Sequence, residues 1–380
     1  MTRSPLLDAD GAIGRQDGAE SDVPAHFGDP FAEQRAASRR AVVVDRSDRD
    51  TVVVSGPDRL SWLHLLLSQQ VADLPEGAGT EALVLDVQGR VEHHAVISHV
   101  GAGVATGDGS AGEVWLDVEA GTAGALAAYL EKMRFWSDVA VRDASDEFAL
   151  LSLVGPQVAD VLTAAGVEMP AGDAGPLSGG GIVRRKPWPE GGAVDLTVPR
   201  SALVDWFGRL RGAGASPAGF DAFEALRVAS LRPRLGLDTD EKTIPHEVGW
   251  IGAAVHLTKG CYRGQETVSR VSNLGRPPRQ MVLLHLASGD DALPPPGTPV
   301  LSAEGGRPVG RIGTAVRHHE LGSVALALVK RSAVTGGGEL WVADDRDAGG
   351  TPGPATVDPD SVPPDTGEPP GRAAVRRLHG

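Results

Sequence analysis

The alternation of apolar and polar residues divides the chain, from Arg40 onward, into short strands and helices. β-Branched runs from Ala41 to Val44 and from Thr51 to Val54 predict two strands. A helix-start signal at Ser55 to Asp58 precedes apolar residues that recur at helical spacing from Leu60 to Val71. The first elements therefore alternate between extended and helical periodicity.

The same patterns continue through the middle of the chain. Further strands are predicted at 81–86, 91–100, 114–118, 139–142, 148–154 and 194–198, and further helices at 122–133, 156–162, 200–211 and 220–231. Residues 171–192 are rich in Gly and Pro and predict a loop. Because several strands are joined by short turns, such as Gln88-Gly89, the pattern favours an α+β fold over a purely parallel sheet.

The pattern changes at Met281. Short apolar runs at 281–286, 298–301, 309–316 and 324–329, separated by Gly and Pro, are typical of a small antiparallel barrel. We therefore predict a C-terminal β-barrel at residues 281–345, after a body at 39–280. Composition predicts a disordered arm at 1–38 and a disordered tail at 346–380.

Composition and charge exclude several classes of protein. The chain has 380 residues, 41% of them hydrophobic, and a net charge of -14, which argues against a general nucleic-acid binder. A single cysteine excludes a disulfide framework and a metal site built from several thiolates. No apolar run is long enough to span a membrane, and the acidic N-terminal segment resembles neither a signal nor a transit peptide. We expect a cytoplasmic protein that does not bind membranes or nucleic acid.

The only cysteine lies in an octapeptide of unusual composition. Residues 259–266, called here the cysteine motif, are Lys-Gly-Cys-Tyr-Arg-Gly-Gln-Glu. Its two glycines predict a shaped loop rather than a packed strand. Lys259 and Arg263 flank Cys261, and nearby cations favour the thiolate, the reactive form of cysteine. We therefore predict a reactive thiol, against the alternative of a buried and inert one.

The adjacent histidines do not predict a metal site. His93 and His94 follow one another on a predicted strand, so their side chains point to opposite faces and cannot easily converge on one ion. The pair His318-His319 has the same defect. We expect no metal site.

Several segments together resemble a known family. The cysteine motif resembles the signature of the YgfZ family of folate-binding proteins, which are similar to the glycine-cleavage T protein and are implicated in the maturation of iron–sulfur enzymes. Weaker resemblance, in the same order along the chain, extends over about residues 40–340 and includes Leu85 to Val91, Glu224 to Ala229, Ile244 to Glu247, Leu274 to Arg276 and Arg279. The resemblance implies a three-domain ring of the glycine-cleavage T protein type, with two subdomains in 39–280 and the barrel as the last domain.

The resemblance also implies a cofactor, tetrahydrofolate or a one-carbon derivative. Its pterin N–H groups suit a carboxylate, its aminobenzoyl ring an apolar wall, and its glutamate tail a cation. The candidate contacts are Arg227, Glu247, Lys259, Tyr262, Arg263, Gln265 and Glu266, with Trp250 as an alternative wall. Each has an ordinary structural alternative: Arg227 suits a helix-surface ion pair, Tyr262 and Trp250 suit a core, and Gln265 and Glu266 suit a helix start.

The resemblance finally implies a function. We expect a tetrahydrofolate-binding protein that supports the assembly or repair of iron–sulfur enzymes, with folate and iron–sulfur clients or assembly proteins as partners and Cys261 as the functional thiol. Where the glycine-cleavage T protein has Gly-Gly-hydrophobic-x-Asp-Asp, this chain has Gly89 to His94, with histidines in place of the aspartates. We therefore expect no glycine-cleavage activity. The alternatives are a folate-dependent aminomethyl- or methyltransferase and a non-catalytic thiol redox module.

Overall fold

The chain forms two compact units in a computed structural model. The structure describes residues 3–15, 20–101, 112–190, 192–287, 292–335, 339–343 and 353–362. The first unit consists of residues 1–82 and 93–226, and the second of residues 83–92 and 227–380. In the described part of the chain, no helix combines the length and the apolar character that crossing a membrane requires.

A six-stranded sheet forms the larger part of the first unit. Its order is β10-β11-β12-β9-β3-β13, and only the pair β13 and β3 is parallel. The strands are β3 (Val42–Asp45), β9 (Phe148–Val154), β10 (Ala174–Pro176), β11 (Ile182–Lys186), β12 (Ala193–Pro199) and β13 (Ser216–Ala218). The helices are α1 (Pro30–Arg39), α4 (Val158–Ala164), α5 (Leu203–Gly212) and α6 (Phe220–Ala229).

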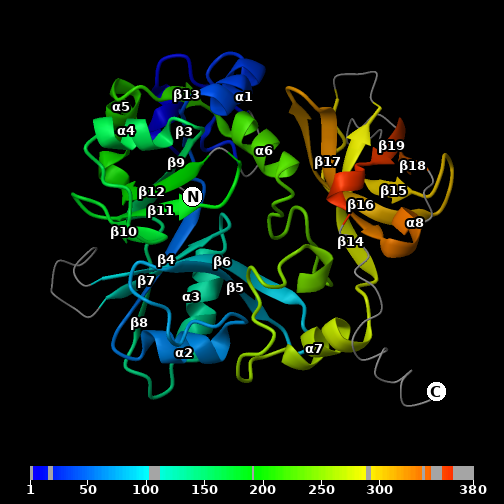
Figure 1. Cartoon of the computed structure of the whole chain (residues 1–380), viewed down its shortest axis with the longest axis horizontal. Helices are drawn as coiled ribbons and strands as arrows, with labels where there is room; N and C mark the ends of the chain where they lie inside the picture. The colour runs from blue at the N-terminus through cyan, green and yellow to red at the C-terminus, as the bar shows by residue number, and fades with distance from the viewer. Residues whose placement is uncertain are drawn as a thin grey trace. The chain divides into compact units, whose positions relative to one another are not determined.

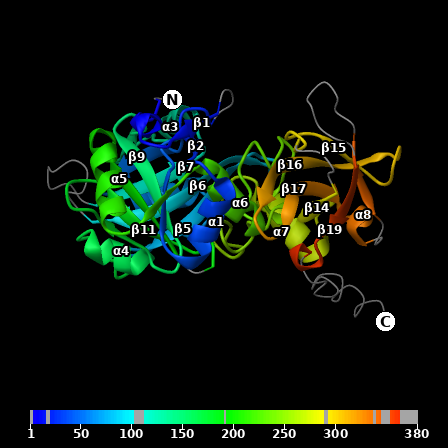
Figure 2. The ribbon, with the colours of Figure 1, turned by 90° about the horizontal axis from the view of Figure 1, so that it is seen from above.

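Side-chain alternation explains why helices cover both faces of this sheet. Val43 packs in a core cluster with α4 and α5, whereas Val42 and Val44 pack in a second cluster with α1 and α6. Figure 2 shows the two helix pairs on opposite sides of the strands. A strand that is buried on both faces is a continuous apolar run, as the Val-Val-Val segment of β3 is.

An antiparallel sheet of five strands follows the order β5-β6-β7-β4-β8. Its strands are β4 (Asp50–Ser55), β5 (Gly79–Leu85), β6 (Val91–Val100), β7 (Glu113–Val118) and β8 (Ala140–Asp143). Helix α3 (Ala123–Lys132) contacts β4 and β8, and α2 (Arg59–Leu66) contacts β7. The tip of the hairpin formed by β5 and β6 belongs to the second unit.

The second unit contains a closed barrel of six strands, β14-β17-β16-β15-β18-β19 (yellow to red in Figure 1). The strands are β14 (Arg279–Leu286), β15 (Pro299–Leu301), β16 (Pro308–His318), β17 (Gly322–Lys330), β18 (Leu340–Val342) and β19 (Gly353–Val357), with α8 (Arg331–Thr335) after β17. Closure removes the exposed strand edges of an open sheet. The predicted α+β class with a C-terminal barrel is confirmed.

The expectation of a disordered arm at 1–38 is wrong for much of that segment. It contains the 3₁₀ turn η1 (Pro5–Asp8), the short strands β1 (Ile13–Gly14) and β2 (Pro24–His26), and most of α1. Leu6 lies in the core cluster of α4 and α5. The sequence pattern did not predict this packing, because the segment has few large apolar residues and α1 buries its small residues Ala36 and Ala37 against the sheet.

The predicted start of a disordered tail at 346 is wrong as well. β19 and the 3₁₀ turn η4 (Pro359–Ser361) lie beyond that boundary. β19 closes the barrel by pairing with β18 and β14, and Ala355 is buried in the barrel core. The Pro- and Gly-rich composition of the segment hid a strand of only five residues. Residues 363–380 of the predicted tail lie outside the described part of the chain.

The predicted loop at 171–192 contains β10 and β11, which the pattern missed because β11 carries buried charges. Arg184 on β11 forms ion pairs with Asp117 at 2.7 Å and Asp195 at 2.5 Å. Lys186 lies 3.3 Å from Asp195, and burial lowers the pKa of Lys186 to about 8. Buried ion pairs replace apolar side chains here, so the apolar alternation that marks a strand is absent.

Candidate functional site

The candidate site lies in the second unit, where three segments that carry the family resemblance come together. These segments are the turn of the β5–β6 hairpin at Asp86 to Arg90, the 3₁₀ turn η3 (Pro245–Glu247), and the cysteine motif with the helix that follows it, α7 (Gln265–Leu274). The Val91 N–H donates to the Thr243 carbonyl at 3.0 Å, which joins the hairpin to the segment before η3. Helix α7 contacts η3 in turn.

Two glycines bring the hairpin turn and the cysteine motif into backbone contact. Gly89 and Gly264 both have positive φ, at 78° and 82°. A Cβ atom on Gly264 would lie 2.5 Å from the Asp86 carbonyl oxygen and 2.9 Å from the Gly89 Cα. A Cβ on Gly89 would lie 2.8 Å from Thr267 Cβ. Only glycine suits both the conformation and the space at these positions.

An ion pair adds to this contact. Arg263 Nη1 donates to Glu92 Oε2 at 2.9 Å, and both side chains are more than a third exposed. In water such a pair contributes at most about 1 kcal/mol, so its main effect is to orient the loop. The Arg263 guanidinium thus pairs with Glu92 of the hairpin, and its role as a folate contact stays a prediction.

The remaining residues of the motif differ in their exposure. Cys261 is exposed and unpaired with another cysteine, so its sulfur is accessible. Tyr262 next to it is buried, and the Lys259 ammonium lies 5.2 Å from the centre of the Tyr262 ring. Gln265 Nε2 donates to the Lys259 carbonyl at 3.2 Å, which closes the loop on itself. Glu266 is exposed in the first turn of α7.

Lys259 and Tyr262 are the two motif residues with perturbed electrostatics. Burial lowers the pKa of Lys259 to about 8 and raises the pKa of Tyr262 to about 12. The Tyr262 hydroxyl is buried and has no hydrogen-bond partner among the described residues. Since buried polar groups are nearly always satisfied, this hydroxyl is a candidate contact for a bound molecule. The loop that presents the exposed thiol therefore also contains a buried cation and a hydroxyl without a described partner.

Glu247 has a structural role that the sequence did not reveal. Arg279 donates to both Glu247 oxygens, at 2.9 and 2.8 Å, and to both Asp240 oxygens, at 3.1 and 2.6 Å. Glu247 Oε2 also accepts the Ile244 N–H at 3.1 Å. Hydrogen bonds and charge attraction from Glu247 and Asp240 raise the pKa of Arg279. Glu247 thus fixes η3 to the start of the barrel, and its contact with pterin stays a prediction.

Arg227, at the end of α6, is likewise a structural residue. Its guanidinium is buried and donates to Asp238 Oδ2 at 2.8 Å, to Thr314 Oγ1 at 2.7 Å and to the Arg232 carbonyl. Gly313 leaves room for this arrangement, because a Cβ there would lie 2.4 Å from Asp238 Oδ1. The guanidinium is buried and not on the helix surface, and its contact with folate stays a prediction.

Two further residues near η3 complete the support of the site. His246 Nε2 lies 2.8 Å from Ser272 Oγ on α7, and burial lowers the pKa of His246 to about 4, so the ring is neutral near pH 7. Trp250 is buried, which fits a core residue better than a folate wall. His246 thus links η3 to the helix that begins at the cysteine motif, a role that the sequence did not suggest.

The histidines in place of the T-protein aspartates have different surroundings. His94 Nε2 lies 3.0 Å from Glu81 Oε2 on the neighbouring strand β5. Burial lowers the pKa of His93. Glu92, the carboxylate nearest to the substituted positions in the sequence, is paired with Arg263. In this segment, the described residues therefore place no aspartate where the T-protein pattern has two.

Comparison with known proteins supports this description of the fold. Residues 16–259 match the family model described as GCVT N-terminal domain, and residues 279–362 match that of the CAF17 C-terminal beta-barrel domain. The chain belongs to the GCVT N-terminal domain family. The second match extends through β19, in agreement with the corrected end of the barrel. Residues 260–278, which contain Cys261, lie between the two matches.

Similar proteins include enzymes. An aminomethyltransferase of Rubrobacter xylanophilus is 30% identical over 68% of this chain and 69% of its own length. A putative chloroplastic transferase of Arabidopsis thaliana is 24% identical over 86% of this chain and 74% of its own length. The crystal structure of the glycine cleavage system aminomethyltransferase T from Bartonella henselae matches with a TM-score of 0.77 at 20% identity, covering 94% of this chain and 96% of that one. The predicted fold of the glycine-cleavage T protein is confirmed.

The glycine contact generates a first prediction. Gly264→Ala should lower the free energy of unfolding by roughly 2 to 4 kcal/mol, because it adds a steric overlap with the hairpin to the strain of positive φ. Gly249→Ala is the matched control, since Gly249 also has positive φ but a Cβ there meets nothing within 4 Å. Urea unfolding of both variants measures the difference, and equal losses would show that the two backbones do not press together.

Lys259 generates a pH prediction. Its pKa is about 8 in the folded protein and 10.5 in its ordinary state. Between these values the unfolded chain binds more protons than the folded protein, so the stability contributed at Lys259 rises as the pH rises through this window. The free energy of unfolding of the wild type relative to Lys259→Met should increase from pH 8 to pH 10, by roughly 2 kcal/mol. Urea unfolding at four pH values tests this, and a constant difference would contradict it.

Proposed function

We propose that this protein binds tetrahydrofolate or a one-carbon derivative and supports the assembly or repair of iron–sulfur enzymes through Cys261. The observation that carries the proposal is the buried Tyr262 hydroxyl without a described partner, beside the buried Lys259 and the exposed thiol. The family match adds support, because relatives in this family are named aminomethyltransferases, and the sequence resemblance implies folate as the cofactor.

The residues present fit folate in part. Lys259 suits the carboxylates of the glutamate tail, because an anion close to a buried ammonium offsets the loss of its hydration. The Tyr262 hydroxyl can bond to a polar group of the ligand, and the exposed Glu266 carboxylate can accept pterin N–H groups. Arg227 and Glu247 already bond to protein groups, so the proposal assigns the first folate contacts to Lys259, Tyr262 and Glu266. Bound folate would supply a carrier for one-carbon units.

Cys261 is proposed as the group that acts on the iron–sulfur client. One thiol cannot hold a whole cluster, because clusters usually take several cysteines. A transient contact with cluster iron or a thiol exchange with a client therefore suits a single exposed sulfur better than a resident cluster. The rigid attachment of the cysteine motif to the hairpin fixes the position of this thiol within the second unit.

The aminomethyltransferase function is the alternative, and the names of the relatives favour it. That reaction in the T protein uses an aspartate near the folate nitrogen. In this chain His93 and His94 stand in the segment, and Glu92 pairs with Arg263. We therefore favour a folate-binding protein without glycine-cleavage activity. Formation of methylene-tetrahydrofolate at the rate of an authentic T protein, with the other glycine-cleavage components supplied, would reverse this preference.

Folate binding is tested by calorimetry. Tetrahydrofolate should bind the full chain, and Lys259→Met and Tyr262→Phe should each weaken binding by roughly 3- to 10-fold, the effect of losing one polar contact. Lys242→Met is the matched control, because Lys242 is an exposed lysine of the same unit. A titration of the folded wild type without heat at millimolar ligand would refute folate binding.

The role of the thiol is tested separately. Cys261→Ser should leave the melting temperature and folate affinity nearly unchanged, because the side chain is exposed. In cells that lack the wild-type protein, the same variant should fail to restore the activity of iron–sulfur enzymes. Arg270→Gln, an exposed change on α7, should restore it. Full restoration by Cys261→Ser would remove the thiol from the mechanism while leaving folate binding intact.

A further inference from the structure

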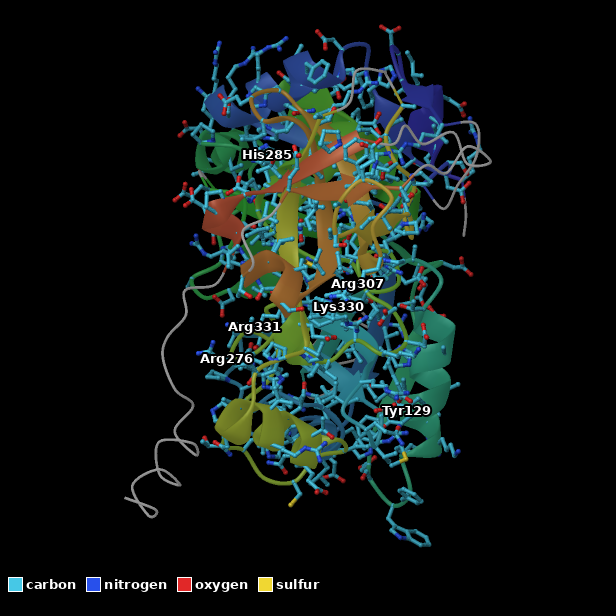
Figure 3. The ribbon with its side chains drawn as sticks, turned by 90° about the vertical axis from the view of Figure 1, so that its right-hand side faces the viewer. Tyr129, Arg276, His285, Arg307, Lys330 and Arg331 are labelled. Atoms are coloured by element: carbon cyan, nitrogen blue, oxygen red, sulfur yellow. The ribbon has the colours of Figure 1, made fainter. Side chains whose placement is uncertain are left out.

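Three cations gather at one end of the C-terminal barrel. Arg307 lies at the end of the turn between β15 and β16, Lys330 is the last residue of β17, and Arg331 is the first residue of α8. We call these three residues the basic barrel end. Figure 3 shows them in the same part of the second unit, with Arg276 next to Arg331.

Backbone contacts hold these cations together. Lys330 Nζ donates to the Pro308 carbonyl at 3.5 Å, directly after Arg307. The Arg331 N–H donates to the Pro278 carbonyl at 3.0 Å, which links α8 to the segment that contains Arg276. Lys330 is also opposite Arg279 in the pairing of β14 with β17. The cluster is therefore built on strand ends and a turn, and its backbone is ordered before any partner arrives.

The basic barrel end differs from the other cations of the barrel. Arg279 forms ion pairs with two carboxylates. Arg311 donates to the carbonyls of Leu237 and Thr239, and His285 lies 2.9 Å from Asp358. By contrast, none of Arg307, Lys330 and Arg331 forms an ion pair with a carboxylate of the described residues. Glu304 lies in the same turn as Arg307 and is exposed without such a pair. Apart from the contact of Lys330 Nζ with the Pro308 carbonyl, no interaction among the described residues accounts for the grouping of these three charges.

The charge of the whole chain makes the cluster informative. The net charge is -14, yet Arg307, Lys330 and Arg331 lie in the same part of the second unit. At physiological salt the Debye length is about 8 Å, so a partner at this surface experiences mainly the local charges. The remote acids reduce the attraction of any large polyanion, whose length would extend beyond the cluster.

We propose that the basic barrel end binds an acidic segment of a partner protein. A short run of Glu or Asp side chains matches three cations spaced over a turn, a strand end and a helix start. Binding to nucleic acid usually involves 6 to 10 phosphate contacts, more cations than this surface offers, and an anionic membrane would meet the repulsion of the acidic remainder. The proposal is independent of folate binding, since none of these residues belongs to the candidate folate site.

A labelled peptide tests the proposal directly. A fluorescent peptide of ten L-glutamates, titrated with the full chain at low salt, should show a rise in anisotropy that weakens as salt increases. The triple variant Arg307→Gln, Lys330→Gln, Arg331→Gln should bind the peptide roughly tenfold more weakly, since each surface charge pair contributes up to about 1 kcal/mol. The triple variant Arg39→Gln, Arg40→Gln, Lys132→Gln removes the same net charge from exposed positions of the first unit and should bind as the wild type does.

Two outcomes would overturn the proposal. Equal loss of affinity in both triple variants, or no binding of the peptide at low salt, would show that the basic barrel end is not a docking surface. Tighter binding of a ten-nucleotide RNA or of anionic vesicles than of the peptide, lost in the barrel variant alone, would assign the surface to another class of partner. Unchanged tetrahydrofolate binding by the barrel variant keeps these results separate from the proposed function.

Discussion

The candidate site depends on the approach of two backbones that only glycine allows. Gly89 in the β5–β6 turn and Gly264 before α7 face one another at a distance where a single added Cβ would overlap a carbonyl oxygen. This contact joins segments that are 175 residues apart in the chain, as the difference between 264 and 89 shows. It places the cysteine motif, with its exposed thiol, on a rigid support instead of a free loop.

Buried and half-buried charges complete that support, and they include residues that carry the charges a folate contact would need. Arg279 binds Glu247 and Asp240, and Arg227 binds Asp238, in surroundings where a single unpaired charge would cost several kcal/mol. These pairs connect η3 and the end of α6 to the barrel. The proposed chemistry therefore rests on two groups without such partners among the described residues: the exposed Cys261 thiol and the hydroxyl of Tyr262, which follows it in the sequence.

Much of the fold could be predicted because its elements carry clear periodicity. The strands at 41–44 and 148–154 and the helix at 122–133 are found within one or two residues of their predicted ends. Prediction failed where burial used unusual residues. α1 packs through alanines, β11 through Arg184, and β19 is a short strand in a Pro-rich segment. Hydrophobic patterns report large apolar side chains, and these three elements have few of them.

The sequence alone determined the α+β class and the C-terminal barrel, because periodicity is a local property of the chain, and its unusual composition made the cysteine motif the candidate site. The tertiary structure decided which of its polar residues have protein partners. Glu247 and Arg227 carry the right charges for a folate contact, but their partners lie 32 and 11 residues away, at Arg279 and Asp238. An ion pair depends on distance in space, and sequence spacing does not specify that distance once the chain turns through loops. For the same physical reason, the grouping of Arg307, Lys330 and Arg331 follows from the strand pairing of the closed barrel and is not apparent from the sequence.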